Sequence, residues 1–207
     1  MYNAIKNVER SNLDKHQLRN KLDLPAKAFV IISVVRFNHQ KNIKATVSIA
    51  EKLSGNSDIL FLIIGDGEEK AEIENLISKN NLTNILLLGY QSNIYEYLSA
   101  SDIYLSTSLW EGLPYSLIEA AANGLPIVAS DVTGNNKVVT DGENCYLFQL
   151  NKISDAVEKI LQIKNSPKEQ KLLGDTSLKI FKEKFQLDTM INKMKEIYNS
   201  SNGEEQK

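Results

Sequence analysis

The chain has 207 residues, of which 42% are hydrophobic and 24% charged, a composition typical of a soluble globular protein. Its formal net charge of −2 and its pI near 5.8 argue against a general basic surface for nucleic acid or an anionic membrane. One cysteine, Cys145, excludes an internal disulfide and a zinc site built from several cysteines.

Short apolar runs alternate with segments of helical spacing over the first three quarters of the chain. Residues 29–35 read FVIISVV, a β-branched run typical of a strand that is buried on both faces. Residues 41–53 then have apolar side chains at helical spacing. The same alternation predicts further strands over 59–64, 85–88, 103–105, 126–129 and 146–148, and further helices over 68–78, 94–100 and 116–123.

This alternation predicts the fold class. Strands that alternate with helices imply right-handed βαβ units, so we expect an α/β fold built on a doubly wound parallel sheet. From Ile153 onward the pattern is helical only, and it predicts helices over 153–164, from Pro167 onward and over 187–198. We assign residues 1–199 to one domain that includes these C-terminal helices, and 200–207 to a disordered tail.

The loops that follow the strands are the places to search for a site, because ligands of open parallel sheets bind outside the carboxyl ends of the strands. Gly65 and Gly67 follow one strand, but position 70 is lysine, so the dinucleotide-binding fingerprint is not met. A tight turn and a direct ligand contact both explain these glycines. The sequence contains no Walker-type loop and no G-x-S-x-G motif, and two histidines are too few for a His-rich metal site.

Two cations lie in the loop after the first predicted strand. Arg36 and Lys41 flank the point where this loop meets a helix N-terminus, whose free N–H groups favour anions. A guanidinium and an ammonium together can neutralise a diphosphate without a metal ion. Taken alone, two solvated cations on a loop would be the simpler explanation.

Two glutamates lie around the start of the predicted helix 116–123. Glu111 lies in the preceding loop and Glu119 in the opening turns of the helix, a spacing that can set both carboxylates on the rim of one pocket. A carboxylate is a good acceptor for paired sugar or ribose hydroxyls, and Gly112 would let the backbone approach a ligand closely. A capping box from Ser116 to Glu119 explains the second glutamate as well, so the residues alone leave both roles open.

These segments resemble the family 4 retaining glycosyltransferases (glycosyl transferase group 1), in the C-terminal, donor-binding half of their two-domain GT-B fold. The resemblance rests on the E-x7-E region within residues 111–130 and on Arg36 followed five residues later by Lys41. It covers roughly residues 1–148 in register and implies a Rossmann-like domain. Further matching segments are 88–90 (LGY), 100–103 (ASDI), 106–108 (STS) and 141–144 (DGEN).

The resemblance implies a role for each residue of the site. Arg36 and Lys41 would hold the diphosphate of the donor, and Glu119 would grip its ribose hydroxyls. Glu111 would be the catalytic residue and would hold the sugar near the reacting carbon, while charge that develops on the departing diphosphate is stabilised. No metal ion or other cofactor is expected. The remaining implied donor contacts are backbone groups of Gly112, Leu113, Pro114 and Tyr115 at the sugar, and of residues 89–93, including Gly89 and Tyr90, at the base.

Some features depart from the family pattern. Val35 replaces a common glycine, Cys145 replaces another, and Lys137 places a cation where glutamate is usual, which bears on donor identity and activity. Residues 1–5 resemble the strand that begins the family's second domain, so the N-terminal acceptor domain is expected to be absent. Because a cleft with one wall excludes water poorly, we expect the chain alone to bind donor weakly and to transfer poorly unless another chain supplies the missing half.

The sequence therefore predicts the donor-binding half of a hexosyltransferase that moves a sugar from a UDP-, GDP- or similar nucleotide to a glycan or lipid-linked acceptor with retention. Surface polysaccharide or glycolipid synthesis is the expected setting. A nucleotide-sugar epimerase of the same fold and a truncated, non-catalytic nucleotide-sugar-binding module remain as alternatives.

Partners and location are predicted from the same residues. An apolar face on the last helix, formed by Met190, Met194 and Ile197, predicts self-association as an alternative to a separate N-terminal-domain chain. No nucleic-acid partner is expected. No apolar run approaches the roughly 20 residues of a membrane helix, and residues 1–7 lack the apolar core of a signal peptide. We therefore expect a cytoplasmic protein that meets the inner face of a membrane only through a partner.

Overall fold

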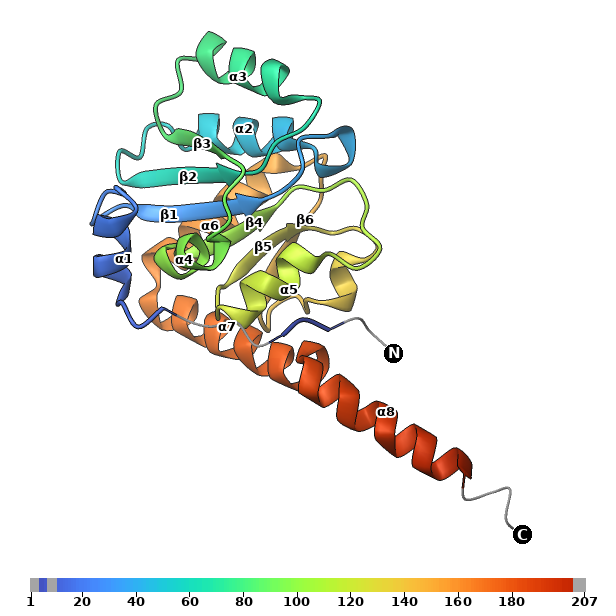
Figure 1. The fold of residues 1–207 in the computed structure, drawn as a ribbon. Helices are drawn as coiled ribbons and strands as arrows, with labels where there is room; N and C mark the ends of the chain where they lie inside the picture. The colour runs from blue at the N-terminus through green and yellow to red at the C-terminus, as the bar shows by residue number, and fades with distance from the viewer. Residues whose placement is uncertain (1–3, 7–10, 203–207) are drawn as a thin grey trace.

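A computed structural model describes residues 4–6 and 11–202 of the chain. Within them, a six-stranded sheet carries helices on both faces, and the last helix extends away from the sheet (Figure 1). The strands are β1 (Phe29–Val34), β2 (Ile59–Ile64), β3 (Ile85–Gly89), β4 (Ile103–Ser106), β5 (Ile127–Ser130) and β6 (Cys145–Phe148). The helices are α1 (Lys15–Lys21), α2 (Ile43–Lys52), α3 (Lys70–Lys79), α4 (Ile94–Ala100), α5 (Tyr115–Ala122), α6 (Ile153–Asn165), α7 (Pro167–Ile180) and α8 (Leu187–Asn202), with short turns η1 (His39–Lys41), η2 (Asn135–Lys137) and η3 (Phe181–Phe185).

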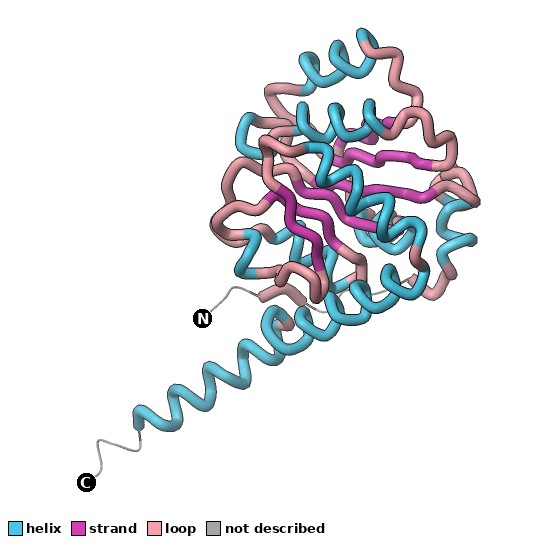
Figure 2. The backbone as a smooth tube through the Cα atoms, turned by 180° about the vertical axis from the view of Figure 1, so that it is seen from behind, coloured by secondary structure: helices cyan, strands magenta, loops and turns pink. Residues whose placement is uncertain are grey.

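All neighbouring strands are parallel, in the order β3-β2-β1-β4-β5-β6. The predicted doubly wound α/β fold is confirmed. Alternate residues of β1 enter different cores: Val30 and Ile32 pack on the side of α4 and α5, and Ile31 packs on the side of α2 and α6. The helices accordingly cover both faces of the sheet, as the two opposite views show (Figures 1 and 2). This double burial explains why the strands read as continuous apolar runs.

The strand order also fixes where a ligand can bind. The chain moves outward in one direction from β1 to β3, then returns to the centre at β4 and moves outward the other way. The loops after β1 and β4 therefore lead to helices on opposite faces of the sheet, α2 and α5, and open α/β sheets bind ligands at such a switch point.

Helix α1 was not among the predicted elements. Asp14 is its N-cap residue: the Gln17 amide donates to Asp14 Oδ1, and the Asp14 amide donates to Gln17 Oε1. The helix is held to the sheet by Arg19, which is 5% exposed and whose Nη2 lies 2.7 Å from Asp102 Oδ2. An arginine on the inner face breaks the apolar periodicity by which a helix is found in a sequence.

The two ends of the chain differ in part from expectation. Residues 1–5 were expected to form a strand by resemblance, but residues 1–3 lie outside the described residues, and Ile5 forms a single bridge to Gln186 instead of joining the sheet. At the other end, α8 continues to Asn202, beyond the predicted end at Tyr198. The rest of the predicted tail, 203–207, also lies outside the described residues.

Helix α8 projects from the body of the domain (Figure 1). Met194 and Ile197 are exposed, and Met190 is half-buried. The predicted self-association through this face stays a prediction. Within residues 4–6 and 11–202, no helix combines the length and the apolar character needed to cross a membrane.

Candidate functional site

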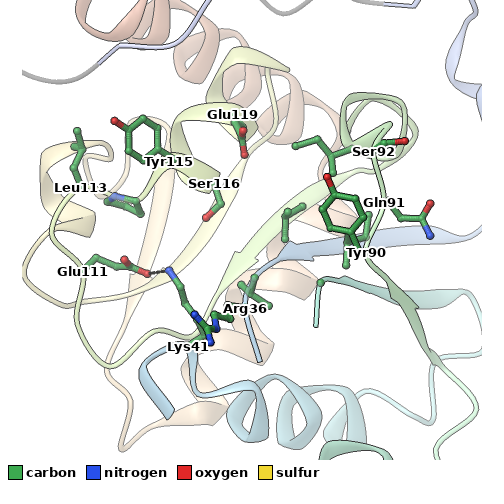
Figure 3. Close-up of a pocket in the computed structure, with 16 residues that line it drawn as sticks. Arg36, Lys41, Tyr90, Gln91, Ser92, Glu111, Leu113, Tyr115, Ser116 and Glu119 are labelled. Atoms are coloured by element: carbon green, nitrogen blue, oxygen red, sulfur yellow. Dashed lines mark hydrogen bonds and ion pairs between the residues drawn. The ribbon is translucent and has the colours of Figure 1, made fainter. Parts of the chain in front are cut away.

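A cavity of about 510 Å³ opens at the carboxyl edge of the sheet, between the loops that follow β1 and β4. Its volume lies in the range of small-molecule sites. Arg36 and Lys41 line it from the segment after β1, and Glu119 faces the same cavity from α5 (Figure 3). The lining residues are Val34, Val35, Arg36, Lys41, Ile64, Gly65, Tyr90, Gln91, Ser92, Ile94, Glu111, Leu113, Pro114, Tyr115, Ser116 and Glu119.

Arg36 lies in a loop that is held to the core by the buried side chain of its neighbour Phe37. The neighbouring Phe37 side chain is fully buried in the core beneath the loop, whereas the Arg36 side chain is 72% exposed. Its Nη2 lies 3.5 Å from Glu68 Oε2, a solvent-exposed contact that contributes little energy. The guanidinium can therefore turn to an anion in the cavity at small cost.

Gly65 and Gly67 allow the loops after β1 and β2 to lie backbone to backbone. A Cβ on Gly65, whose φ is +135°, would lie 1.8 Å from the Val35 carbonyl oxygen, and one on Gly67 would lie 2.3 Å from that of Phe37. The Phe37 amide donates to the Asp66 carbonyl at 2.9 Å across the same contact. Both glycines are thus explained by the close approach of the two backbones. Of the two, only Gly65 lines the cavity.

Lys41 and Glu111 form an ion pair on the cavity wall (Figure 3). Lys41 Nζ lies 2.5 Å from Glu111 Oε1, and the two side chains are 18% and 7% exposed. Ser108 Oγ donates to the same carboxylate oxygen at 2.7 Å. Gln40 Nε2 lies 3.4 Å from Oε2 and donates to the Trp110 carbonyl at 2.8 Å. The Glu111 carboxylate is therefore held from several sides.

Hydrogen bonds between the two loops bring this pair together. The Leu109 amide donates to the Gln40 carbonyl at 2.8 Å, and Thr107 Oγ1 lies 3.0 Å from the carbonyl oxygens of both Lys41 and Asn42. Asn42 adopts a left-handed conformation with φ 49°, which ends the η1 turn and delays the start of α2 to Ile43. The predicted start of this helix at Lys41 is therefore wrong by two residues, and Lys41 lies in the turn before it.

Glu119 enters the cavity from the second turn of α5 (Figure 3). The helix begins at Tyr115 with Pro114 as its N-cap residue and without a side-chain cap. Ser116 therefore lies inside the helix, and the capping-box interpretation of Ser116 and Glu119 is wrong. Burial raises the pKa of the Glu119 carboxyl above its usual value of 4.5, because the cavity wall removes water from the charged form.

The raised pKa predicts how Glu119→Gln changes stability with pH. Folding disfavours the charged carboxylate, so the wild type bears this penalty fully above the folded-state pKa and loses it as the pH falls below about 4.5. We expect Glu119→Gln to increase the free energy of unfolding at pH 7 by at most about 1 kcal/mol, the size of an ordinary substitution. The gain should disappear in urea titrations at pH 3.5. A difference that grows on acidification would contradict the sign.

The other predicted site residues divide into two groups. Tyr90, Leu113, Pro114 and Tyr115 line the cavity, whereas Gly89 and Gly112 are not among its lining residues. The Gly89 carbonyl accepts from the Gly65 amide at 2.8 Å, and the Gly112 carbonyl accepts from Lys137 Nζ at 3.1 Å. The residues around the cavity to which the sequence analysis gave no such role are Gln40, Ser108 and Ser116, together with the apolar Val34, Val35, Ile64 and Ile94.

The cavity is lined by side chains of both charges. Two cations, Arg36 and Lys41, and two carboxylates, Glu111 and Glu119, line it. Among the residues that the structure describes, no three His, Cys, Asp or Glu side chains gather in a way that could hold a metal ion. The arrangement can neutralise a diphosphate with Arg36 and Lys41 and accept hydrogen bonds from hydroxyl groups with the glutamates.

Comparison with known proteins agrees with this geometry. Residues 14–179 match the family model described as glycosyl transferases group 1. The chain belongs to this family. The match includes the cavity and its charged residues, and it confirms the resemblance found in the sequence.

Two curated members of the group 1 family illustrate the similarity. The chain is 30% identical over 192 residues to UDP-Gal:alpha-D-GlcNAc-diphosphoundecaprenol alpha-1,3-galactosyltransferase of Escherichia coli, covering 90% of this chain and 49% of that protein. It is 29% identical over 174 residues to poly(ribitol-phosphate) alpha-N-acetylglucosaminyltransferase of Staphylococcus aureus, covering 83% of this chain and 35% of that protein. The chain thus spans half or less of the length of these relatives.

Two solved structures share the fold of this chain. Anabaena Alr3699/HepE in complex with UDP superposes with a TM-score of 0.88 at 21% identity, over 97% of this chain and 57% of that one. The C-terminal domain of the group 1 protein LpcC from Francisella tularensis gives a TM-score of 0.78 at 18% identity, over 89% of this chain and 100% of that one. This group 1 chain has the Rossmann-like α/β fold of one GT-B domain.

Proposed function

We propose that this chain binds a nucleotide-sugar donor and is the donor-binding half of a retaining hexosyltransferase. The observation that carries the proposal is one cavity in a group 1 family member that is lined by Arg36 and Lys41 from the segment after β1 and by Glu111 and Glu119 from the loop after β4 and from α5. A nucleotide sugar combines a diphosphate with hydroxyl-rich rings, and these are the groups that such side chains bind.

The geometry suggests how each part of the donor is held. Arg36 and Lys41 take the diphosphate and stabilise its charge as the glycosidic bond breaks. Glu119 on α5 accepts from the ribose hydroxyls, while Glu111 accepts from the sugar and keeps its reacting carbon in place. The first turn of α5, Tyr115 and Ser116, lines the same cavity, and the free N–H groups of a helix start favour an anion there. No metal ion is needed in this scheme, because two organic cations already face the diphosphate.

The acceptor and the setting are proposed from the relatives. One relative is named for a diphosphoundecaprenol-linked sugar and another for poly(ribitol-phosphate), a lipid-linked and a polymeric acceptor. We therefore propose a glycan or lipid-linked acceptor, a role in surface polysaccharide or glycolipid synthesis, and a location at the cytoplasmic side of the membrane. This chain spans half or less of the length of these relatives, so transfer is assigned to this half together with an acceptor-binding half, supplied by another chain or by more of the same one.

Calorimetric titration of the chain with UDP, GDP and ADP tests the proposal. We expect one of them to bind, and we expect Arg36→Ala and Glu119→Ala each to weaken that binding about tenfold or more, the effect of losing a hydrogen bond to a charged group. Lys27→Ala is the matched control, because it removes an exposed cation at the amino end of β1, the opposite edge of the sheet. Equal binding by all variants, or no binding by the wild type, would refute the assignment.

A further inference from the structure

The ion pair between Lys41 and Glu111 raises a question about the order of events in the cavity. Lys41 Nζ lies 2.5 Å from Glu111 Oε1, and both side chains are largely buried. The one ammonium that faces the cavity from η1 is thus neutralised by a carboxylate of the same cavity. A diphosphate that needs this ammonium has to compete with Glu111 for it.

Sharing the ammonium between both anions is unfavourable. A phosphate oxygen that contacts Lys41 Nζ beside Glu111 would lie within roughly 5 Å of the carboxylate, in a partly buried site where like charges repel more strongly than in water. The second cation, Arg36, is mostly exposed and pairs only loosely with Glu68, so it is free to approach the diphosphate without such a competitor. Lys41 is the cation whose partner has to change.

Ser108 is placed to hold Glu111 through that change. Its hydroxyl donates to Glu111 Oε1 at 2.7 Å, and the residue is only 1% exposed. Its carbonyl accepts from Ser130 Oγ at 2.6 Å, which fixes Ser108 to the end of β5. A carboxylate that loses Lys41 therefore keeps a hydrogen bond and its aim into the cavity.

We propose that donor binding exchanges the partner of Lys41, from Glu111 to the diphosphate, and that Ser108 is the positioning residue that retains the freed carboxylate for the sugar. The inference rests on the function proposed above and adds the order in which the charges act: phosphate first takes the ammonium, and only then is Glu111 available to hydroxyl groups. Glu111 is thus both a ligand of the sugar and a competitor of the diphosphate.

The exchange predicts opposite changes in UDP binding when Glu111 and Glu119 are each replaced by glutamine. Glu111→Gln leaves Lys41 without its counter-ion, so we expect it to bind UDP and inorganic pyrophosphate about tenfold more tightly than the wild type, or about 1.4 kcal/mol. Glu119→Gln is the matched control, since it removes the same charge from the same cavity. We expect it to weaken UDP binding and to leave pyrophosphate binding nearly unchanged. Tighter binding by both variants would mean that the net charge of the cavity alone acts, and it would overturn the exchange.

Ser108→Ala tests the retaining hydroxyl without changing any charge. We expect it to weaken UDP binding about threefold to tenfold in the wild-type background and to have no effect in a Glu111→Gln background, which is the coupling expected of two groups in contact. Ser106→Ala is its control: this hydroxyl is also buried and lies 3.5 Å from Ser108 Oγ, but the structure gives it no bond to Glu111. Equal losses in both backgrounds would assign Ser108 a purely structural role and refute its part in the exchange.

The outcomes separate this inference from the proposed function. If the wild type binds UDP but a folded Glu111→Gln variant binds it equally or more weakly, the exchange is wrong and donor binding stands. If the wild type binds neither UDP nor pyrophosphate nor another nucleotide, donor binding fails and the exchange with it. Should Glu111→Gln not fold, Glu111→Ala carries the same test, because it also removes the counter-ion of Lys41. The exchange then requires that a folded Glu111→Ala variant binds UDP and inorganic pyrophosphate more tightly than the wild type, and equal or weaker binding would overturn it.

Discussion

Replacing Gly134 by alanine is expected to displace the loop that carries Glu111 and to destabilise the domain by roughly 2–5 kcal/mol, the combined effect of overpacking and a strained backbone. A Cβ at this position would lie 2.1 Å from the Glu111 carbonyl oxygen and 2.8 Å from Glu111 Cβ. The φ of Gly134 is +101°, which side-chain-bearing residues rarely adopt. Because the Glu111 amide also donates to the Thr133 carbonyl at 3.0 Å, the two loops cannot move apart without loss.

Gly142→Ala is the control that separates the clash from the backbone strain. Gly142 has a φ of +77°, but nothing lies within 4 Å of the Cβ that alanine would add. Urea unfolding should therefore show a smaller loss for Gly142→Ala than for Gly134→Ala. Only Gly134→Ala should also weaken nucleotide binding, since it alone disturbs Glu111. If both variants lose the same stability and bind nucleotide as the wild type does, the contact between Gly134 and Glu111 affects neither stability nor nucleotide binding.

Asp102→Asn should reduce the free energy of unfolding by about 3–5 kcal/mol, as expected when one partner of a buried ion pair is removed. Asp102 Oδ2 accepts from Arg19 Nη2 and from the Val30 amide, both at 2.7 Å, and Lys15 Nζ lies 2.9 Å from Oδ1. The Arg19 side chain is 7% exposed, and its other N–H groups donate to backbone carbonyls. Asparagine keeps the volume but leaves the guanidinium without a counter-ion.

The matched control for Asp102→Asn lies on α7. Asp175 pairs with Lys171 at 2.5 Å, but both side chains are largely exposed, so Asp175→Asn should change stability little. Urea titration at pH 7 compares the two variants under the same conditions. A loss for Asp102→Asn as small as that for Asp175→Asn would mean that α1 contributes little to the stability of the domain.

Much of the fold could be predicted from the sequence because burial on both faces leaves a simple pattern. The predicted strand 59–64 matches β2, in which every residue is buried, and the predicted helix 94–100 matches α4. Helix α1 escaped prediction because its anchor is Arg19, whose contacts with Asp102 and with three carbonyls depend on segments up to 83 residues away. No local pattern records such a contact.

The sequence predicts which residues lie near the candidate site only because they follow the ends of strands. Arg36, Lys41, Glu111 and Glu119 share one cavity because the loops after β1 and β4 meet at the same edge of the sheet. The contact of Ser108 with Glu111 could not be foreseen, since it depends on how the loop folds back and not on spacing. Ser116 was misassigned for a similar reason: the helix start shifts with Pro114, and one residue decides whether a side chain caps the helix or lines the cavity.

Backbone hydrogen bonds from the residues directly after β1 and β2 continue the parallel ladder to the last residues of β2 and β3. The amide of Val35 donates to the carbonyl of Ile64 at 2.9 Å, and that of Gly65 to the carbonyl of Gly89 at 2.8 Å. Amide protons at this rim should exchange slowly with deuterated solvent, although the segments are loops. A ligand that arrives there meets a preorganised surface, so association loses little loop entropy and its rate is set by diffusion and charge instead of by loop closure.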